Sequence, residues 1–99
     1  MKTTIIHEIN NPSDFFIQTK GGFIYHIREG TGDNLQEEDI DDGYVDYIYY
    51  DYYASLLDLK EDSAYDGGMI LLKKLYKDMT IAEIISKVEE FEDVEFNRF

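Results

Sequence analysis

The sequence contains no cysteine. This absence excludes disulfide bonds, metal sites built on thiolates and enzymes that use a cysteine nucleophile. It also fits a reducing compartment, where structural disulfides are rare. The fold must depend on a hydrophobic core, for which a composition of 43% hydrophobic and 15% aromatic residues is sufficient. The 99 residues predict a single acidic domain that spans residues 1–99.

A long apolar run is also missing. No segment reaches the roughly 18 consecutive apolar residues that a transmembrane helix needs. Residues 1–16 have neither the apolar stretch nor the small-residue cleavage site of a secretory signal peptide. We therefore expect a cytoplasmic protein that has no membrane partner.

Basic residues are scarce. Nine lysines and arginines stand against 22 aspartates and glutamates, which gives a formal net charge of −13. Residues 30–66 hold twelve acidic residues and one basic residue, Lys60, so this third alone has a net charge of −11. Nucleic acid and anionic membranes repel such a surface. We therefore expect no direct nucleic-acid ligand and a basic protein surface as the partner.

The N-terminal half has the residue pattern of β-strands. Residues 2–9 are rich in β-branched side chains and predict a strand. Residues 15–29 predict a hairpin whose turn contains Gly21 and Gly22, which can adopt positive φ. Residues 30–43 predict an exposed acidic loop. The next stretch, YVDYIYYDYY, fits a strand or a helical stripe; we favour a strand through Tyr53, followed by a loop or a short helical turn.

The C-terminal third has helical patterns. Residues 67–78 predict an amphipathic helix with Lys73, Lys74 and Lys77 on its solvated face. Thr80 and Glu83 form a capping box that opens a second helix. The buried stripe of that helix is expected to contain Ile81, Ile84, Ile85, Val88 and Phe91. These elements predict an α+β fold: a small antiparallel sheet of about three strands with two C-terminal helices packed on one face.

The sequence contains no complete motif for a calcium ion, a dinucleotide or a catalytic nucleophile. An EF-hand loop with Gly43 at its sixth position would place Ile40 and Tyr49 at ligand positions, so that motif fails and only a looser, weak cation site stays open. GTGDNL lacks the third glycine of a dinucleotide-binding turn. His7 and His26 lie in predicted strands, where we interpret them as structural or surface histidines. No serine lies in a nucleophile elbow. We therefore predict no enzyme, no catalytic residue, no metal site and no cofactor.

Residues 37–68 combine carboxylates with tyrosines. Tyrosine offers rigid amphipathic area and is enriched in protein interfaces, and carboxylates accept charge-assisted hydrogen bonds from arginine and lysine. The hypothesis is a recognition surface for a basic partner. Its candidate residues are Glu37, Glu38, Asp39, Asp41, Asp42, Asp46, Tyr47, Tyr50, Asp51, Asp58, Glu61, Asp62 and Asp66. On a regular strand Asp46 and Asp51 would point to opposite faces, so one continuous stripe would need a bulge or a helix there.

In size and charge the chain resembles the small phage- and plasmid-encoded inhibitors that block restriction, CRISPR or repair enzymes by mimicking DNA. The resemblance is one of composition, and it implies a nuclease or another nucleic-acid-binding protein as the partner. The alternative is a structural or homodimeric domain. In that case the tyrosines pack a core or a self-interface, and the acidity serves only solubility.

Overall fold

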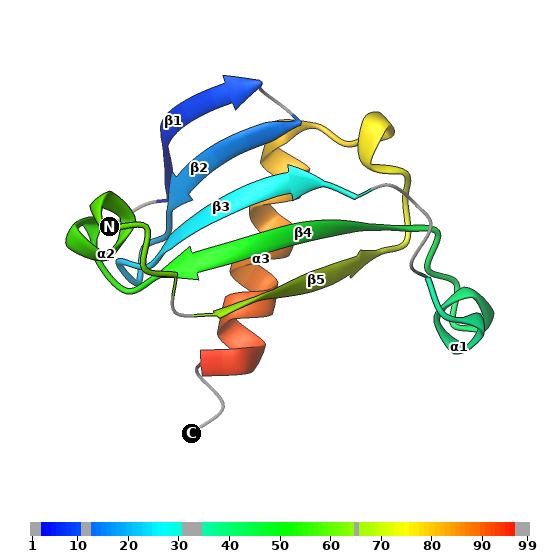
Figure 1. Cartoon of the computed structure of the whole chain (residues 1–99). Helices are drawn as coiled ribbons and strands as arrows, with labels where there is room; N and C mark the ends of the chain where they lie inside the picture. Colours follow the sequence, from blue (N-terminus) through cyan, green and yellow to red (C-terminus); the bar gives the residue numbers. More distant parts are fainter. Residues whose placement is uncertain (1–2, 11–12, 31–34, 65, 97–99) are drawn as a thin grey trace.

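The computed structural model describes residues 3–10, 13–30, 35–64 and 66–96. Its strands form one antiparallel sheet in the order β1-β2-β3-β4-β5, so β1 and β5 are the edges (Figure 1). The strands are β1 (Thr4–Asn10), β2 (Asp14–Gln18), β3 (Ile24–Glu29), β4 (Asp46–Tyr53) and β5 (Asp66–Leu72). The helices are α1 (Glu37–Asp41), α2 (Leu56–Lys60), the 3₁₀ turn η1 (Tyr76–Asp78) and α3 (Ile81–Phe96).

The predicted fold of about three strands with two C-terminal helices is wrong. The sheet has five strands, and α3 is the one long helix among the described residues. The segment predicted as the first C-terminal helix is β5 followed by η1. Two glycines at its start disfavour a helix, and the apolar run MILL fits either structure. Pairing with β4, where Ile48 lies opposite Ile70, decides for the strand.

The hairpin prediction is confirmed. β2 and β3 pair antiparallel, with Phe15 opposite Ile27. Gly22 has φ +91° in the turn, and its N–H donates to the Thr19 carbonyl at 2.9 Å. A residue with a Cβ would be strained at this φ.

The preference for a strand over residues 44–53 is also confirmed, because β4 is the strand between β3 and β5. As the parity of their positions predicts, Asp46 and Asp51 point to opposite faces. Asp46 accepts a hydrogen bond from the N–H of Tyr76 on the α3 side, and Asp51 pairs with Arg28 on the other side.

The predicted capping box begins α3. The Thr80 hydroxyl accepts from the Glu83 N–H, and the Glu83 carboxylate accepts from the Thr80 N–H, both at 3.1 Å. Ile84 and Val88 are fully buried, and the other residues of the predicted stripe pack beside them.

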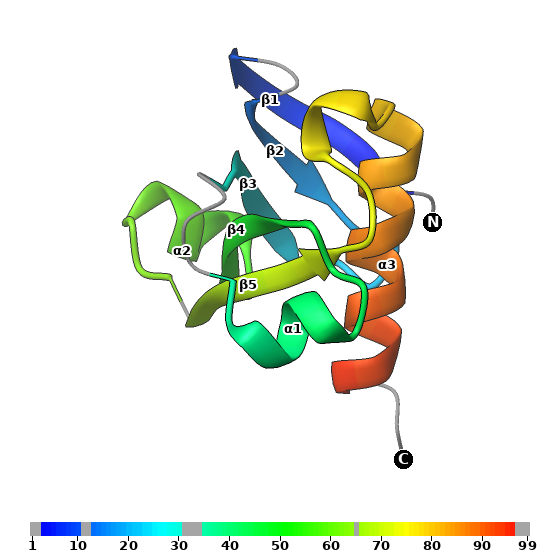
Figure 2. The ribbon, with the colours of Figure 1, turned by 90° about the vertical axis from the view of Figure 1, so that its right-hand side faces the viewer.

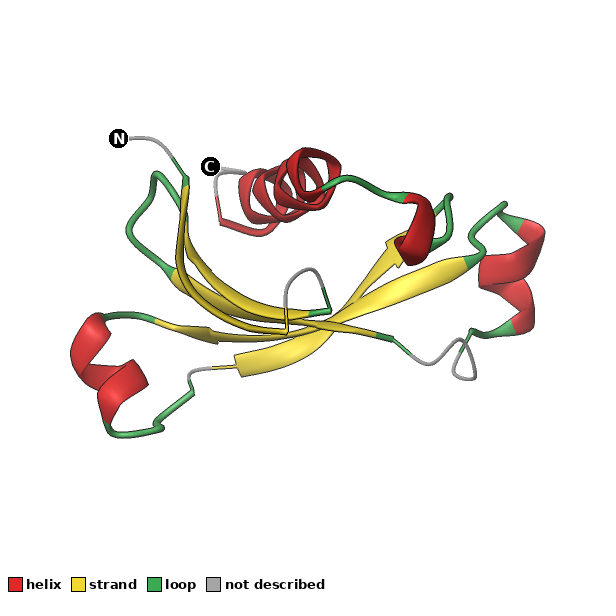
Figure 3. Cartoon of the chain, turned by 90° about the horizontal axis from the view of Figure 1, so that it is seen from above, coloured by secondary structure: helices red, strands yellow, loops and turns green. Residues whose placement is uncertain are grey.

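The core lies between α3 and one face of the sheet (Figures 2 and 3). Its buried members are Phe15, Ile17, Tyr25, Ile27, Ile48, Tyr50, Tyr52, Ile70, Leu72, Tyr76, Ile84 and Val88. Among the described elements, no helix packs across the opposite face of the sheet (Figure 3). None of the helices in the described part of the chain is long and apolar enough to cross a membrane.

Candidate functional site

The first group of predicted acids lies on α1, within the segment predicted as a loop. Glu37, Glu38, Asp41 and Asp42 are exposed, and no residue of α1 is buried. Acidic side chains in the first turn suit the positive end of the helix dipole. Asp39 is half-buried and accepts a hydrogen bond from the Gln36 N–H at 3.4 Å, which closes the N-terminus of the helix. We call these five carboxylates the α1 acidic end.

The second group surrounds α2, where the sequence predicted a loop or a short helical turn. Asp58 donates its backbone N–H to the Ser55 hydroxyl at 3.2 Å, and Ser55 is the N-cap residue of α2. Asp62 accepts from the Tyr53 hydroxyl at 3.3 Å; burial and then the Asp62 charge raise the pKa of Tyr53. Glu61 and Asp66 are exposed. Asp58, Glu61, Asp62 and Asp66 form the α2 acidic end, with Lys60 among them.

The two acidic ends lie at opposite ends of β4 (Figure 1). β4 has eight residues, which corresponds to about 25 Å at 3.3 Å per residue. The carboxylates therefore form two separate clusters and not one continuous stripe.

Three of the predicted site residues are in the interior. Asp46 is 8% exposed, and its two carboxylate oxygens accept from the backbone N–H groups of Tyr47 and Tyr76 at 2.9 and 2.8 Å. Tyr47 is fully buried, and Tyr50 packs against Phe91 of α3 with 5.0 Å between ring centroids. These side chains hold the fold together and present almost no surface to a partner.

Asp51 lies on the face of the sheet opposite α3. Its carboxylate accepts from Arg28 at 2.8 Å, so its charge is already compensated. Beside this pair, His26 stacks on Phe16 with 4.2 Å between centroids and contacts the Asp14 carboxylate. His26 thus has structural partners, in line with its interpretation from the sequence. His7 lies in β1.

Sequence reasoning missed three apolar residues on the short helices. Ile40 of α1 is 57% exposed, and Leu56 and Leu57 of α2 are 61% and 62% exposed. Neither helix buries any residue, so these side chains add little to the core. The signal available in the sequence was a pair of leucines followed directly by an acid in a segment already expected to be short and exposed.

Within the described part of the chain, no lysine, arginine or histidine forms an ion pair with a carboxylate of either acidic end. The ion pairs found among the described residues are His26–Asp14, Arg28–Asp51, Lys74–Glu83 and Lys87–Glu90. None of them includes a residue of the α1 or the α2 acidic end. These charges are therefore available to a partner.

No cluster of three or more histidine, cysteine, aspartate or glutamate side chains that could hold a metal ion is found in the described part of the chain. Comparisons with protein-family models, with curated proteins and with solved structures found no match for this chain.

Proposed function

We propose that the protein binds a basic surface of another protein through the α1 and α2 acidic ends. The observation that carries this proposal is that exposed apolar side chains accompany the carboxylates: Ile40 on α1, and Leu56 and Leu57 on α2. Acids that serve only solubility need no exposed leucines, which make a surface more prone to aggregate. Apolar contacts surrounded by polar groups are the usual arrangement of a protein interface.

The chemistry of each end suits lysine and arginine. A partner's ammonium or guanidinium groups would form charge-assisted hydrogen bonds with the carboxylates. The exposed leucines would lose their contact with water against apolar surface of the partner, at roughly 25 cal/mol per Å² buried. The charge would also accelerate the encounter by electrostatic steering.

The most specific form of the proposal is inhibition of a nucleic-acid-binding enzyme by DNA mimicry. The two acidic ends lie beyond opposite ends of β4, whose length is about 25 Å, and the longest dimension of the molecule is 39 Å, which is close to the roughly 34 Å of one DNA turn. A groove lined with lysine and arginine for duplex DNA could therefore contact both ends. In this form the protein acts in the cytoplasm, where its target works, and has no catalytic role of its own.

The alternative function is self-association, in which Leu56 and Leu57 pack against a second copy of the chain. Sedimentation velocity at low and high ionic strength separates the two. Our proposal predicts a monomer at both. The net charge of −13 opposes self-association at low ionic strength, and at high ionic strength, where this repulsion is screened, two exposed leucines offer much less apolar area than a stable dimer buries. A dimer that persists at high ionic strength would favour the alternative.

A capture experiment tests the proposal. Immobilised protein is incubated with bacterial lysate, with and without excess duplex DNA, and bound proteins are identified by mass spectrometry. Three variants with the same change in charge are compared: Asp41→Lys/Asp42→Lys on α1, Glu61→Lys/Asp66→Lys at α2, and the control Asp78→Lys/Glu90→Lys, whose residues are exposed elsewhere.

The expected result is one basic protein that the wild type and the control retain, that either acidic-end variant loses and that DNA displaces. Leu56→Ser/Leu57→Ser should weaken its capture without any change in charge. Equal capture by all variants would contradict the proposal. Capture that DNA does not affect would exclude the mimicry form alone.

A further inference from the structure

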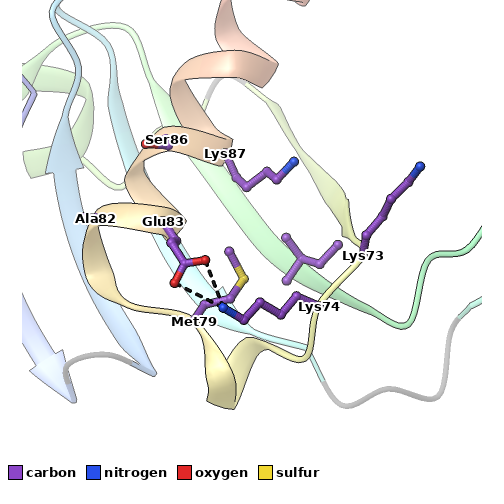
Figure 4. A pocket seen from close by; sticks show the side chains of 8 residues that line it. Lys73, Lys74, Met79, Ala82, Glu83, Ser86 and Lys87 are labelled. Carbon is purple, nitrogen blue, oxygen red and sulfur yellow. Dashed lines mark hydrogen bonds and ion pairs between the residues drawn. The ribbon is translucent and has the colours of Figure 1, made fainter.

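A cleft on the α3 side of the molecule differs in charge from the rest of the surface. It lies between the end of β5, η1 and the first turns of α3, and it has a volume of about 430 Å³ (Figure 4). Small-molecule sites typically have volumes of about 300–1,000 Å³. The cleft is separate from both acidic ends, because none of their residues lines it.

Three lysines and one glutamate line this cleft, which gives it a formal net charge of +2 in a protein of net charge −13. Lys74 is bound to Glu83: its Nζ lies 3.1 and 3.4 Å from the two carboxylate oxygens (Figure 4). The Thr80 N–H foremost, and then Lys74, hold the pKa of Glu83 below its ordinary value. Glu83 therefore stays ionised and compensates the charge of Lys74.

The positive charges of Lys73 and Lys87 are only weakly compensated by neighbouring carboxylates. Lys73 has no ion pair with a described residue; its Nζ lies 5.2 Å from the centroid of the Tyr44 ring. Lys87 is 3.7 Å from Glu90 in an exposed pair, and such pairs contribute little. Both lysines also line an adjoining hollow of about 390 Å³, so they stand where the two depressions meet.

The remaining lining of the cleft is mostly apolar. Leu72, at the end of β5, is 1% exposed, and Met79 packs against the core. Ala82, in the first turn of α3, also lines the cleft, and its side chain is a single exposed methyl group. The cleft thus combines an apolar wall with two ammonium groups that lack full compensation.

We infer that this cleft binds a small organic anion with an apolar body, of the class of a medium-chain carboxylate. The anionic head lies between Lys73 and Lys87, and the apolar body contacts Met79 and Ala82, with the buried Leu72 behind them. A charged head beside apolar surface is the general arrangement of small-molecule sites, where a few polar groups fix the orientation of a mostly apolar ligand. The inference is independent of the proposed function, because no residue of the acidic ends takes part.

Methionine methyl NMR tests the site directly. The full chain, labelled at its methionine methyl groups, is titrated with octanoate and, separately, with 1-octanol. Octanoate should shift the Met79 signal in a saturable way, whereas Met69, which lies in β5 and does not line the cleft, should stay in place. 1-Octanol should bind at least about tenfold more weakly, because it lacks the charge that the lysines recognise.

Two variants separate the charge from the apolar wall. Lys73→Gln/Lys87→Gln should weaken octanoate binding at least about tenfold, whereas the control Lys20→Gln/Lys77→Gln, which removes two exposed lysines outside the cleft, should leave it within about twofold. Ala82→Phe should fill the cleft and abolish the Met79 shift with both lysines present. The inference is overturned if octanoate leaves Met79 unshifted, if 1-octanol binds as well as octanoate, or if the two double variants behave alike.

Discussion

At the scale of single residues, two buried carboxylates show how little an acidic composition says about an individual acid. Asp46 lies in the most acidic third of the chain, yet it joins β4 to η1 through hydrogen bonds from two backbone N–H groups. Glu92 of α3 is 4% exposed and accepts from the hydroxyls of Thr19 and Tyr25 at 2.8 and 3.3 Å. Neither role has a local signal, because the donors are far away in sequence or belong to the backbone.

Removal of the Asp46 carboxylate should destabilise the protein. Asp46→Ala leaves the N–H groups of Tyr47 and Tyr76 without their acceptor, which should lower the free energy of unfolding by about 2–4 kcal/mol. Urea denaturation measures this change. Asp41→Ala, which removes an exposed acid, is the control and should stay within about 0.5 kcal/mol of wild type. Equal stabilities of the two variants would contradict the structural role of Asp46.

The burial of Glu92 predicts a pH dependence. Burial raises the pKa of Glu92 above its ordinary value, although the hydrogen bonds from Thr19 and Tyr25 oppose the shift. As the pH rises from the unfolded pKa of about 4.3 through the higher folded pKa, the unfolded chain loses its proton first. The contribution of Glu92 to stability therefore falls over this range and is constant above it.

Glu92→Gln should remove this fall in the free energy of unfolding, because glutamine does not titrate. Its amide oxygen can still accept hydrogen bonds from Thr19 and Tyr25. The variant should unfold at higher urea than wild type at neutral pH, and the difference should disappear below about pH 4. Glu90→Gln, an exposed change on the same helix, controls for the removal of one charge from an acidic protein. A gain for Glu92→Gln that is the same at both pH values, or no larger than that of the control, would refute the argument.

At the scale of the elements, local signals were sufficient for some and failed for others. The hairpin turn at Gly22 and the capping box at Thr80 and Glu83 are determined within a few residues, so β2, β3 and α3 could be predicted. The strand β5 could not be predicted, because its apolar run fits the residue pattern of a helix as well as that of a strand. Only its pairing with β4 determines that it is a strand. α1 was missed because a five-residue helix that buries nothing has no apolar stripe.

The capping box gives an element-scale prediction. Thr80→Ala removes the hydroxyl that accepts from the Glu83 N–H, which should cost about 1 kcal/mol of unfolding free energy. Thr80→Ser keeps the hydroxyl and should stay close to wild type. Thermal unfolding measures both, with about 4–8 °C expected per kcal/mol for a domain of this size. An unchanged melting temperature for Thr80→Ala would mean that tertiary packing alone fixes the start of α3.

At the scale of the whole molecule, the charged side chains lie in separate regions, and the sequence predicted this arrangement only in part. The middle third of the chain was expected to form a single recognition surface, but the strand β4 divides it. Odd and even positions of β4 face opposite sides of the sheet. The helices α1 and α2, with their acidic residues, lie at its two ends (Figure 1). Of the three lysines expected on a solvated helix face, Lys73 and Lys74 line a cleft beside α3 (Figure 4), whereas Lys77 lies outside it. Such separation depends on tertiary packing, which no single segment encodes.

The central claim is that the two acidic ends form the contact with a basic partner, and the affinity of the captured protein tests it most directly. Isothermal titration compares wild type, the Asp41→Lys/Asp42→Lys and Glu61→Lys/Asp66→Lys variants, and the Asp78→Lys/Glu90→Lys control. We predict that each acidic-end variant binds at least about tenfold more weakly, because reversed charges face the partner's lysines and arginines, and that the control stays within about twofold of wild type. Acidic-end variants that bind as tightly as the control would contradict the account.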